Sequence, residues 1–254
     1  MNSERITSRQ NPLIRQTRQL LRDGNSRRES GLYAADGVKL LEEALRWGAP
    51  VRTVIASDGA ALPALPEGVR VVRTPPGVMD SVSLMKTPQG VLFLCALPEP
   101  APLSFANGGL VLDGIQDPGN LGAILRTADA METPVVLCEG CADPWSPKVV
   151  RASMGAVFRT VPQRAGAEET AAYCEAHGVR LYAAALHEDA ADLRTLDLNG
   201  AAVVIGSEGQ GVGPVLLARA GGRVIIPMNP RCESLNAASA AAIILWQMRV
   251  LRGG

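Results

Sequence analysis

The chain has 254 residues, of which 47% are hydrophobic, and its 25 basic residues balance its 25 acidic ones. This length suits one large domain or two modest ones, and the apolar content excludes an intrinsically disordered chain. Without a run of about 18 apolar residues or an apolar N-terminal stretch, we expect neither a membrane span nor a secretion signal. A net charge of zero argues against nucleic-acid binding, unless the charges are unevenly distributed.

The charges are indeed unevenly distributed along the sequence. Residues 1–100 carry a net charge of +3 and residues 101–254 a net charge of −3. Seven arginines and a single acidic residue lie within residues 5–28. Such a basic arm is either the solvated face of an ordinary helix or a surface that binds phosphate groups. The arginines that we consider for the second interpretation are Arg9, Arg15, Arg18 and Arg22.

The five cysteines indicate a reducing compartment. They are an odd number in a chain without a secretion signal, which predicts free thiols in a cytoplasmic protein. Cys138 and Cys141 form a CxxC pair, and Cys174 and His177 a CxxH pair, so together they have the spacing of zinc ligands. However, Cys138 ends an apolar run typical of a buried strand, and Cys174 lies in a helical pattern. We therefore favour structural thiols and expect no metal.

The first half of the sequence alternates between helical and extended patterns. Apolar residues at helical spacing predict a helix over 36–47, and short apolar runs predict strands at 51–55, 69–72 and 90–94. These elements indicate a small α/β domain over residues 1–98. A stretch rich in proline and alanine, residues 99–107, then predicts a linker.

The second half repeats apolar runs that are followed by polar turns and helices. The runs predict strands at 110–112, 135–137, 180–183, 202–205 and 224–226. Because continuous apolar runs are typical of strands buried on both faces, we expect a largely parallel sheet with helices on both sides. Ligands of such sheets bind beyond the carboxyl ends of the strands. The turns that follow the strands are therefore the candidate site.

Two of these turns contain polar residues next to glycines. The first has Asn120, which is placed to cap a helix, and Arg126 about two turns further on. The second, residues 206–213, has four glycines around Glu208. It is not a P-loop, because Val212 stands where lysine is required, and it lacks the glycine order of a dinucleotide-binding turn.

The third polar turn, residues 227–236, precedes a long apolar helix predicted over 237–251. Either Ser234 or Asn236 is placed to cap this helix. A helix that is apolar on most sides is buried in a core or in an interface, which favours dimerisation.

In this order and spacing, the three turns resemble the signature motifs of the SpoU (TrmH-type) branch of the SPOUT RNA methyltransferases. The matching segments are 120–126, 206–209 and 226–236. Residues 146–156 are also similar to the family, and residues 36–39 and 87–91 resemble its L30e-like substrate-binding domain. The resemblance extends over nearly the whole chain.

This resemblance implies an α/β protein with two domains. An L30e-like domain over 1–98 would bind the substrate, and a SPOUT domain over 108–254, with a parallel sheet and a trefoil knot, would form a homodimer. The implied reaction transfers a methyl group from S-adenosylmethionine to a ribose 2′-hydroxyl of RNA, with ribosomal RNA favoured over transfer RNA. The alternatives are a transfer-RNA enzyme, an inactive SPOUT-fold RNA-binding protein, and a nucleotide-binding oxidoreductase or hydrolase.

The resemblance also assigns roles to individual residues. The cofactor would be held by Gly206, Gly209, Ile226, Met228 and Leu235, largely through backbone groups. Arg126 matches the family's catalytic arginine; a guanidinium, with a pKa above about 12, is a poor base, so we expect it to orient the substrate and stabilise charge. Glu208 would fix Arg126 or accept a proton. The other expected active-site residues are Asn120, Ser234 and Asn236, and the expected RNA-binding residues are the four arginines named above.

Overall fold

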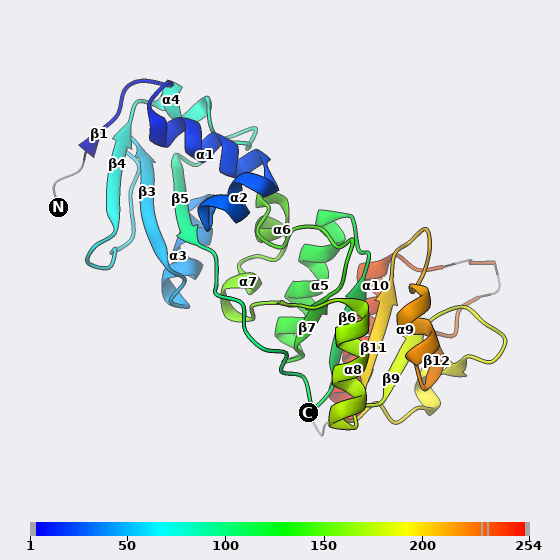
Figure 1. Cartoon of the computed structure of the whole chain (residues 1–254). Helices are drawn as coiled ribbons and strands as arrows, with labels where there is room; N and C mark the ends of the chain where they lie inside the picture. The colour runs from blue at the N-terminus through cyan, green and yellow to red at the C-terminus, as the bar shows by residue number, and fades with distance from the viewer. Residues whose placement is uncertain (1–3, 230, 233, 252–254) are drawn as a thin grey trace. The chain divides into compact units, whose positions relative to one another are not determined.

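The computed structural model describes residues 4–229, 231–232 and 234–251, which form two compact units with a sheet in each (Figure 1). The first unit extends to Glu99 and also includes Trp145–Arg159. The second unit comprises Pro100–Pro144 and the chain from Thr160 onward. Within the described residues, no helix is long and apolar enough to cross a membrane.

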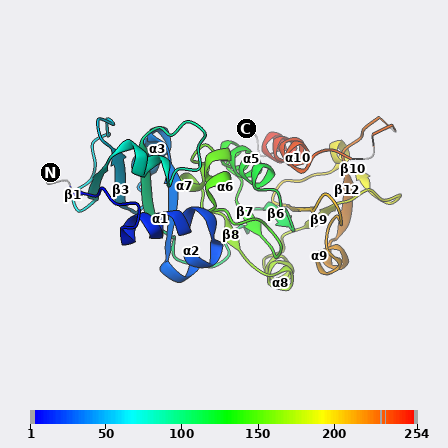
Figure 2. The same ribbon diagram turned by 90° about the horizontal axis from the view of Figure 1, so that it is seen from above.

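The first unit is built on a five-stranded mixed sheet with the strand order β1-β4-β3-β5-β2. Helices α1 and α2 cover one face of this sheet and α3 covers the other (Figure 2). The predicted helix and the three predicted strands are confirmed within a few residues, whereas β2 was not predicted. The elements are β1 (Glu4–Arg5), α1 (Pro12–Arg22), α2 (Gly24–Ser30), β2 (Leu32–Asp36), α3 (Val38–Arg46), β3 (Val51–Ser57), β4 (Arg70–Thr74), α4 (Pro76–Asp80) and β5 (Val91–Ala96).

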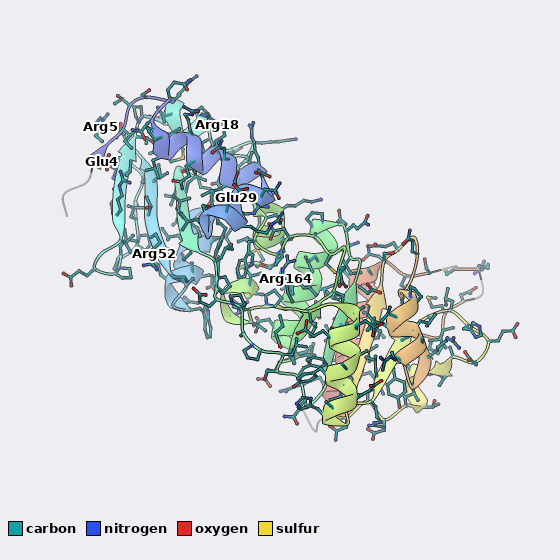
Figure 3. The ribbon with its side chains drawn as sticks, viewed as in Figure 1. Glu4, Arg5, Arg18, Glu29, Arg52 and Arg164 are labelled. Carbon is teal, nitrogen blue, oxygen red and sulfur yellow. The ribbon has the colours of Figure 1, made fainter. Side chains whose placement is uncertain are left out.

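Helix α1 begins with a strong local signal and has two distinct faces. The Asn11 side chain accepts a hydrogen bond from the backbone N–H of Leu13, and Pro12 occupies the first turn. Its apolar face is buried in the core of the first unit. Arg15 and Arg22 are exposed. Arg18 is half-buried (Figure 3). Three of the seven arginines of the arm therefore lie on a packed helix, and a fourth, Arg27 of α2, is buried.

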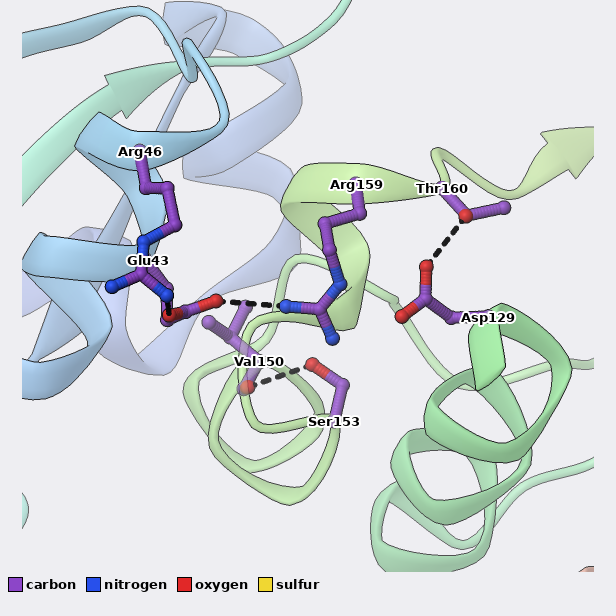
Figure 4. A network of polar contacts seen from close by, with 7 residues as sticks. All are labelled: Glu43, Arg46, Asp129, Val150, Ser153, Arg159 and Thr160. Atoms are coloured by element: carbon purple, nitrogen blue, oxygen red, sulfur yellow. Dashed lines mark hydrogen bonds and ion pairs between the residues drawn. The ribbon is translucent and has the colours of Figure 1, made fainter. Parts of the chain in front are cut away.

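A segment from the middle of the sequence, residues 145–159, packs into the first unit. It forms α6 (Pro147–Ala152) and α7 (Ala156–Arg159). The ring of Trp145 lies 4.9 Å from that of Tyr33, and the Arg159 guanidinium lies 2.8 Å from a carboxylate oxygen of Glu43 (Figure 4). The sequence alone assigned this segment to the second domain, but its apolar side chains are buried among those of the first unit.

The second unit is built on a seven-stranded sheet in which every pair of neighbouring strands is parallel, in the order β10-β12-β9-β11-β6-β7-β8. All five predicted strands are confirmed, and the two short edge strands β8 and β10 were not predicted. The strands are β6 (Gly109–Asp113), β7 (Val135–Leu137), β8 (Gln163–Arg164), β9 (Leu181–Ala184), β10 (Ala191–Asp192), β11 (Ala202–Gly206) and β12 (Gly222–Ile225).

Helices cover both faces of this sheet, as expected for buried parallel strands. Helices α5 (Pro118–Ala130) and α10 (Ala237–Leu251) lie on one face, and α8 (Ala167–His177) and α9 (Pro214–Arg219) on the other (Figure 2). A 3-10 turn, Leu193–Thr195, follows β10. After β12 the chain returns across the sheet, and α10 packs against α5 and β11. Since the strands are parallel, the turns after β6, β9, β11 and β12 all lie at the carboxyl-terminal end of the sheet.

Candidate active site

A cavity of about 560 Å³ opens at the carboxyl ends of β9, β11 and β12. This volume is within the range of small-ligand sites, roughly 300–1,000 Å³. Four of the residues predicted to hold a cofactor line the cavity: Gly206, Ile226, Met228 and Leu235. Gly209, the fifth, does not line it. Ser234 and Glu208 contribute polar groups, and the apolar lining includes Leu186, Ile205, Val212, Leu217 and Ile244.

The glycine-rich turn after β11 is closed by backbone hydrogen bonds. The Ser207 N–H donates to the Gly211 carbonyl at 3.1 Å, and the Gly211 N–H donates back to the Ser207 carbonyl at 2.9 Å. A Cβ atom on Gly206 would lie only 2.0 Å from the carbonyl carbon of Gly211. Gly206 is therefore required by close backbone packing inside the turn, which also shapes one wall of the cavity.

Three polar residues from distant parts of the sequence form a hydrogen-bonded chain beside this turn. The Asn236 Nδ2 donates to the Asn120 Oδ1 at 3.0 Å, and the Asn120 Nδ2 donates to the Glu208 carboxylate. Because a carboxylate only accepts, Asn120 must direct its amide nitrogen toward Glu208 and its oxygen toward Asn236. The network fixes the orientation of each side chain and brings the three predicted motifs together.

The helix caps differ partly from the sequence prediction. Asn120 was expected to cap α5, but Asp117 does so: its side chain accepts a hydrogen bond from the Asn120 backbone N–H at 2.8 Å. This leaves the Asn120 side chain available for the network. At the start of α10, the Asn236 Oδ1 accepts from the Ala238 N–H at 2.9 Å, so Asn236 rather than Ser234 is the cap.

Arg126 lies apart from this network. It is six residues beyond Asn120 on α5, a rise of about 9 Å along the helix, and it is exposed. Over the described ranges of the chain, its guanidinium has no hydrogen bond or ion pair. The expected contact between Glu208 and Arg126 is therefore not made in this structure, because Glu208 is bonded to Asn120 instead.

The four residues considered as zinc ligands do not converge. The Cys138 sulfur lies 3.6 Å from the Thr170 hydroxyl, and the Cys141 thiol donates to the Leu112 carbonyl at 3.2 Å. His177 is stacked on the ring of Tyr173. In the part of the chain that the structure describes, no group of three His, Cys, Asp or Glu side chains is placed to hold a metal ion.

The burial of the thiols predicts their reactivity. Burial raises the pKa of Cys95 and Cys138 to about 12 and that of Cys174 to about 11, whereas Cys232 is exposed. Because the thiolate is the reactive form, titration of the native protein with a disulfide reagent should show one fast thiol. The Cys232→Ser variant should lose this fast phase. Burial also raises the pKa of the half-buried Cys141, so a fast phase that survives in this variant would show that Cys141 or one of the three buried thiols is accessible.

The comparison with known proteins identifies the family. Residues 109–246 match the SpoU rRNA Methylase family, and residues 11–92 match the MRM3-like substrate binding domain. The chain is 31% identical over 225 residues to the 23S rRNA (guanosine(2553)-2'-O)-methyltransferase RlmP of Bacillus subtilis, covering 88% of this chain and 90% of that protein. The chain therefore belongs to the SpoU methyltransferase family.

Solved structures agree with this identification. The AdoMet-bound rRNA methyltransferase from Sinorhizobium meliloti superimposes with a TM-score of 0.87 at 29% identity, covering 98% of both chains. The SpoU methyltransferase AviRb from Streptomyces viridochromogenes in complex with AdoMet gives a TM-score of 0.84 at 26% identity, covering 96% of this chain and 99% of that one. The protein is a methyltransferase that uses S-adenosylmethionine, and both the predicted family and the α/β fold class are confirmed.

Four polar residues of the cavity were not predicted as site residues: His187, Ser207, Gln210 and Arg223. His187 follows β9 and Arg223 lies on β12. The rule that ligands bind beyond the carboxyl ends of parallel strands also covers the turn after residues 180–183. That turn contains His187-Glu188-Asp189, and these polar residues after a predicted strand could have identified it as part of the site.

Proposed function

We propose that the protein methylates a ribose 2′-hydroxyl of ribosomal RNA. The observation that carries this proposal is the row of hydrogen-bonded side chains from Asn236 through Asn120 to Glu208. This row ends in a carboxylate that lines the cavity. The relative RlmP is named as a 2′-O-methyltransferase of 23S rRNA, and the first unit matches a substrate-binding domain. We place this activity in the cytoplasm, in keeping with that bacterial relative and with five unpaired cysteines.

The cavity suits S-adenosylmethionine in shape and chemistry. Its apolar side chains can pack against an adenine ring, and the Glu208 carboxylate provides a negative charge for a cationic ligand. Gly206, Ile226, Met228 and Leu235 would hold the cofactor, with the turn around Gly206 fixed by its own backbone packing. When bound, S-adenosylmethionine supplies an electrophilic methyl group on a sulfonium.

The residues around the cavity would then position the ribose and remove its proton. Arg126 is free to bind a phosphate of the RNA and to stabilise negative charge on the 2′-oxygen, since its guanidinium has no partner among the described residues. Glu208 would accept the proton, and Asn120 would hold its carboxylate in place. Asn236 positions Asn120, and Ser234 offers a further hydroxyl at the cavity.

The test of the proposed function is a map of 2′-O-methylation in cells with and without this gene. A site in ribosomal RNA that loses its methyl group in the absence of the gene, and regains it with the purified enzyme and S-adenosylmethionine, is the expected result. A lost site in transfer RNA instead would support the alternative substrate. No lost site in either RNA, together with no methyl transfer in vitro, would contradict the proposal.

The outer face of α1 is the surface we propose for RNA binding. Arg9, Arg15 and Arg22 are exposed, and Arg18 donates weakly to the Ser81 backbone and hydroxyl oxygens, at 3.4 Å each. Arg15, Arg18 and Arg22 recur at helical spacing on one side of the helix. This places three guanidinium groups along one face without an acidic neighbour in α1.

Replacing Arg15, Arg18 and Arg22 with glutamine should weaken RNA binding without changing cofactor affinity. Each lost phosphate contact lowers the slope of log K against log salt by about 0.7–0.9, so the triple variant should lose about two units of slope. A matched triple variant of Arg180, Arg194 and Arg219, each paired with an acidic residue, is the control. Equal losses in the two variants would rule out a specific role for α1.

The outer side of α10 is the surface we propose for the homodimer. Ala241, Ile244, Leu245 and Met248 are buried, whereas Ile243, Trp246 and Val250 are 40%, 59% and 51% exposed. The exposed three lie at helical spacing on one face, and contiguous exposed apolar side chains are typical of interaction sites. A second copy of the chain would bury this face against itself.

Introducing glutamate at Trp246 and Ile243 should convert the dimer into a monomer, because the charges cannot be buried unpaired. Sedimentation velocity measures the change directly. Leu84→Glu, at a residue 45% exposed in the first unit, is the matched control and should remain dimeric. A wild-type protein that sediments as a monomer would contradict the proposed homodimer.

A further inference from the structure

His187, Asp189 and Arg223 form a chain of polar side chains at the cavity. The His187 Nδ1 lies 2.7 Å from one carboxylate oxygen of Asp189, and the Arg223 guanidinium donates to the other. His187 and Arg223 line the cavity, and Asp189 connects them. The loop after β9 is thus attached to β12 through a carboxylate that is bonded on both sides.

This arrangement fixes which nitrogen of the imidazole carries the proton. A carboxylate only accepts hydrogen bonds, and Arg223 keeps Asp189 in this form by donating to it. The Nδ1 of His187 therefore carries the hydrogen, because its 2.7 Å contact with the carboxylate is much shorter than the 3.5 Å approach of the Asp189 backbone N–H to the same nitrogen. In the neutral imidazole, Nε2 then has a free lone pair and acts as a hydrogen-bond acceptor. His187 consequently offers an oriented acceptor to a ligand in the cavity.

The charges of the cavity indicate which part of the cofactor this acceptor fits. S-adenosylmethionine has hydrogen-bond donors on its ribose hydroxyls, its ammonium group and its adenine amino group. The ammonium is repelled by the Arg223 cation, so it would lie away from His187. The planar adenine fits the apolar lining. A neutral acceptor next to a cation therefore suits a hydroxyl.

We propose that His187 binds a ribose hydroxyl of S-adenosylmethionine through Nε2, and that Asp189 and Arg223 are positioning residues for it. The inference rests on the proposed function, because it takes this cavity as the cofactor site. It adds a side-chain contact to a site otherwise attributed to backbone groups. Loss of the contact should weaken cofactor binding about three- to tenfold, the effect of a single hydrogen bond.

Calorimetry with two ligands tests the contact. S-adenosylhomocysteine has both the ribose and the amino acid, and 5′-methylthioadenosine lacks the amino acid. The His187→Ala variant should bind both ligands about three- to tenfold more weakly, and His187→Gln, which keeps a polar group, should recover part of the loss. His177→Ala, at the other histidine of the chain, should bind both ligands like the wild type.

The results separate this inference from the proposed function. A loss with S-adenosylhomocysteine alone would assign His187 to the amino-acid part and overturn the ribose contact. Unchanged affinity for both ligands would overturn the contact altogether. A wild-type protein that binds neither ligand would instead contradict the proposed function.

Nitrogen-15 NMR tests the positioning role independently of binding. The chain has two histidines, so His177→Ala leaves a single imidazole to observe. We expect the proton on Nδ1 in this variant and a mixture of tautomers once Asp189→Asn is added. Glu175→Gln, which alters the exposed pair with Arg219, should leave the tautomer unchanged. A proton on Nε2 in the His177→Ala protein would overturn the proposal.

Discussion

Replacing Arg126 with alanine should abolish methyl transfer and leave the affinity for S-adenosylhomocysteine within about twofold of the wild type. Arg126 does not line the cavity, and it has no bonded partner within the described residues. Its removal should therefore disturb neither cofactor binding nor stability. The charge that develops on the attacking oxygen would lose its donor, which typically costs about 100- to 1,000-fold in kcat. Single-turnover methylation and calorimetry measure the two effects.

Two further variants make this result specific. Arg126→Lys keeps the charge without the planar pair of donors, so it should recover only part of the activity. Arg180→Ala, at an exposed arginine paired with Asp197, should methylate RNA at the wild-type rate. If Arg126→Ala lost cofactor affinity and activity to the same extent, the assigned role would be wrong.

Replacing Gly206 with alanine should remove cofactor binding by deforming the turn after β11. The new Cβ would lie 2.0 Å from the Gly211 carbonyl carbon and 2.2 Å from the Val212 nitrogen, both of them backbone atoms. The backbone must therefore move, and the paired hydrogen bonds between Ser207 and Gly211 would be strained. We expect at least about a hundredfold weaker binding and a Tm about 5 °C lower, as for overpacked sites that cost about 1–3 kcal/mol.

The control for this variant is Gly221→Ala. There the added Cβ meets only the Leu181 carbonyl oxygen, at 3.8 Å, which is an ordinary contact. Cofactor binding and Tm should remain close to those of the wild type. Wild-type binding by Gly206→Ala would show that the turn tolerates a side chain, and that its geometry does not shape the site.

Long apolar patterns and their polar turns were sufficient to predict most of the second unit. The five runs became strands because a parallel sheet buries both faces, and 237–251 became α10 at the predicted bounds. The short edge strands β8 and β10 were not predicted, because a strand of two residues has no recognisable sequence pattern. Strand β2 was missed for a different reason, because its sequence LYAAD is compatible with a helix as well as with a strand.

Contacts between distant residues could not be predicted in the same way. The cap of α5 was misassigned because Asp117 and Asn120 are both good caps. In the structure Asp117 is the cap, and the Asn120 side chain bonds to Glu208, which is 88 residues away. The chain of His187, Asp189 and Arg223 likewise depends on the pairing of β9 with β12. A sequence gives the residue types at such a site, but the strand order decides which of them meet.

The insertion of residues 145–159 into the first unit has a consequence for exchanging this unit between related proteins. The first unit is discontinuous, so the chain passes between the units after Glu99, after Pro144 and after Arg159. Recombination at the linker alone would separate Tyr33 from Trp145 and Glu43 from Arg159. A chimera that takes the first unit from a relative would therefore have to exchange both segments to keep these contacts.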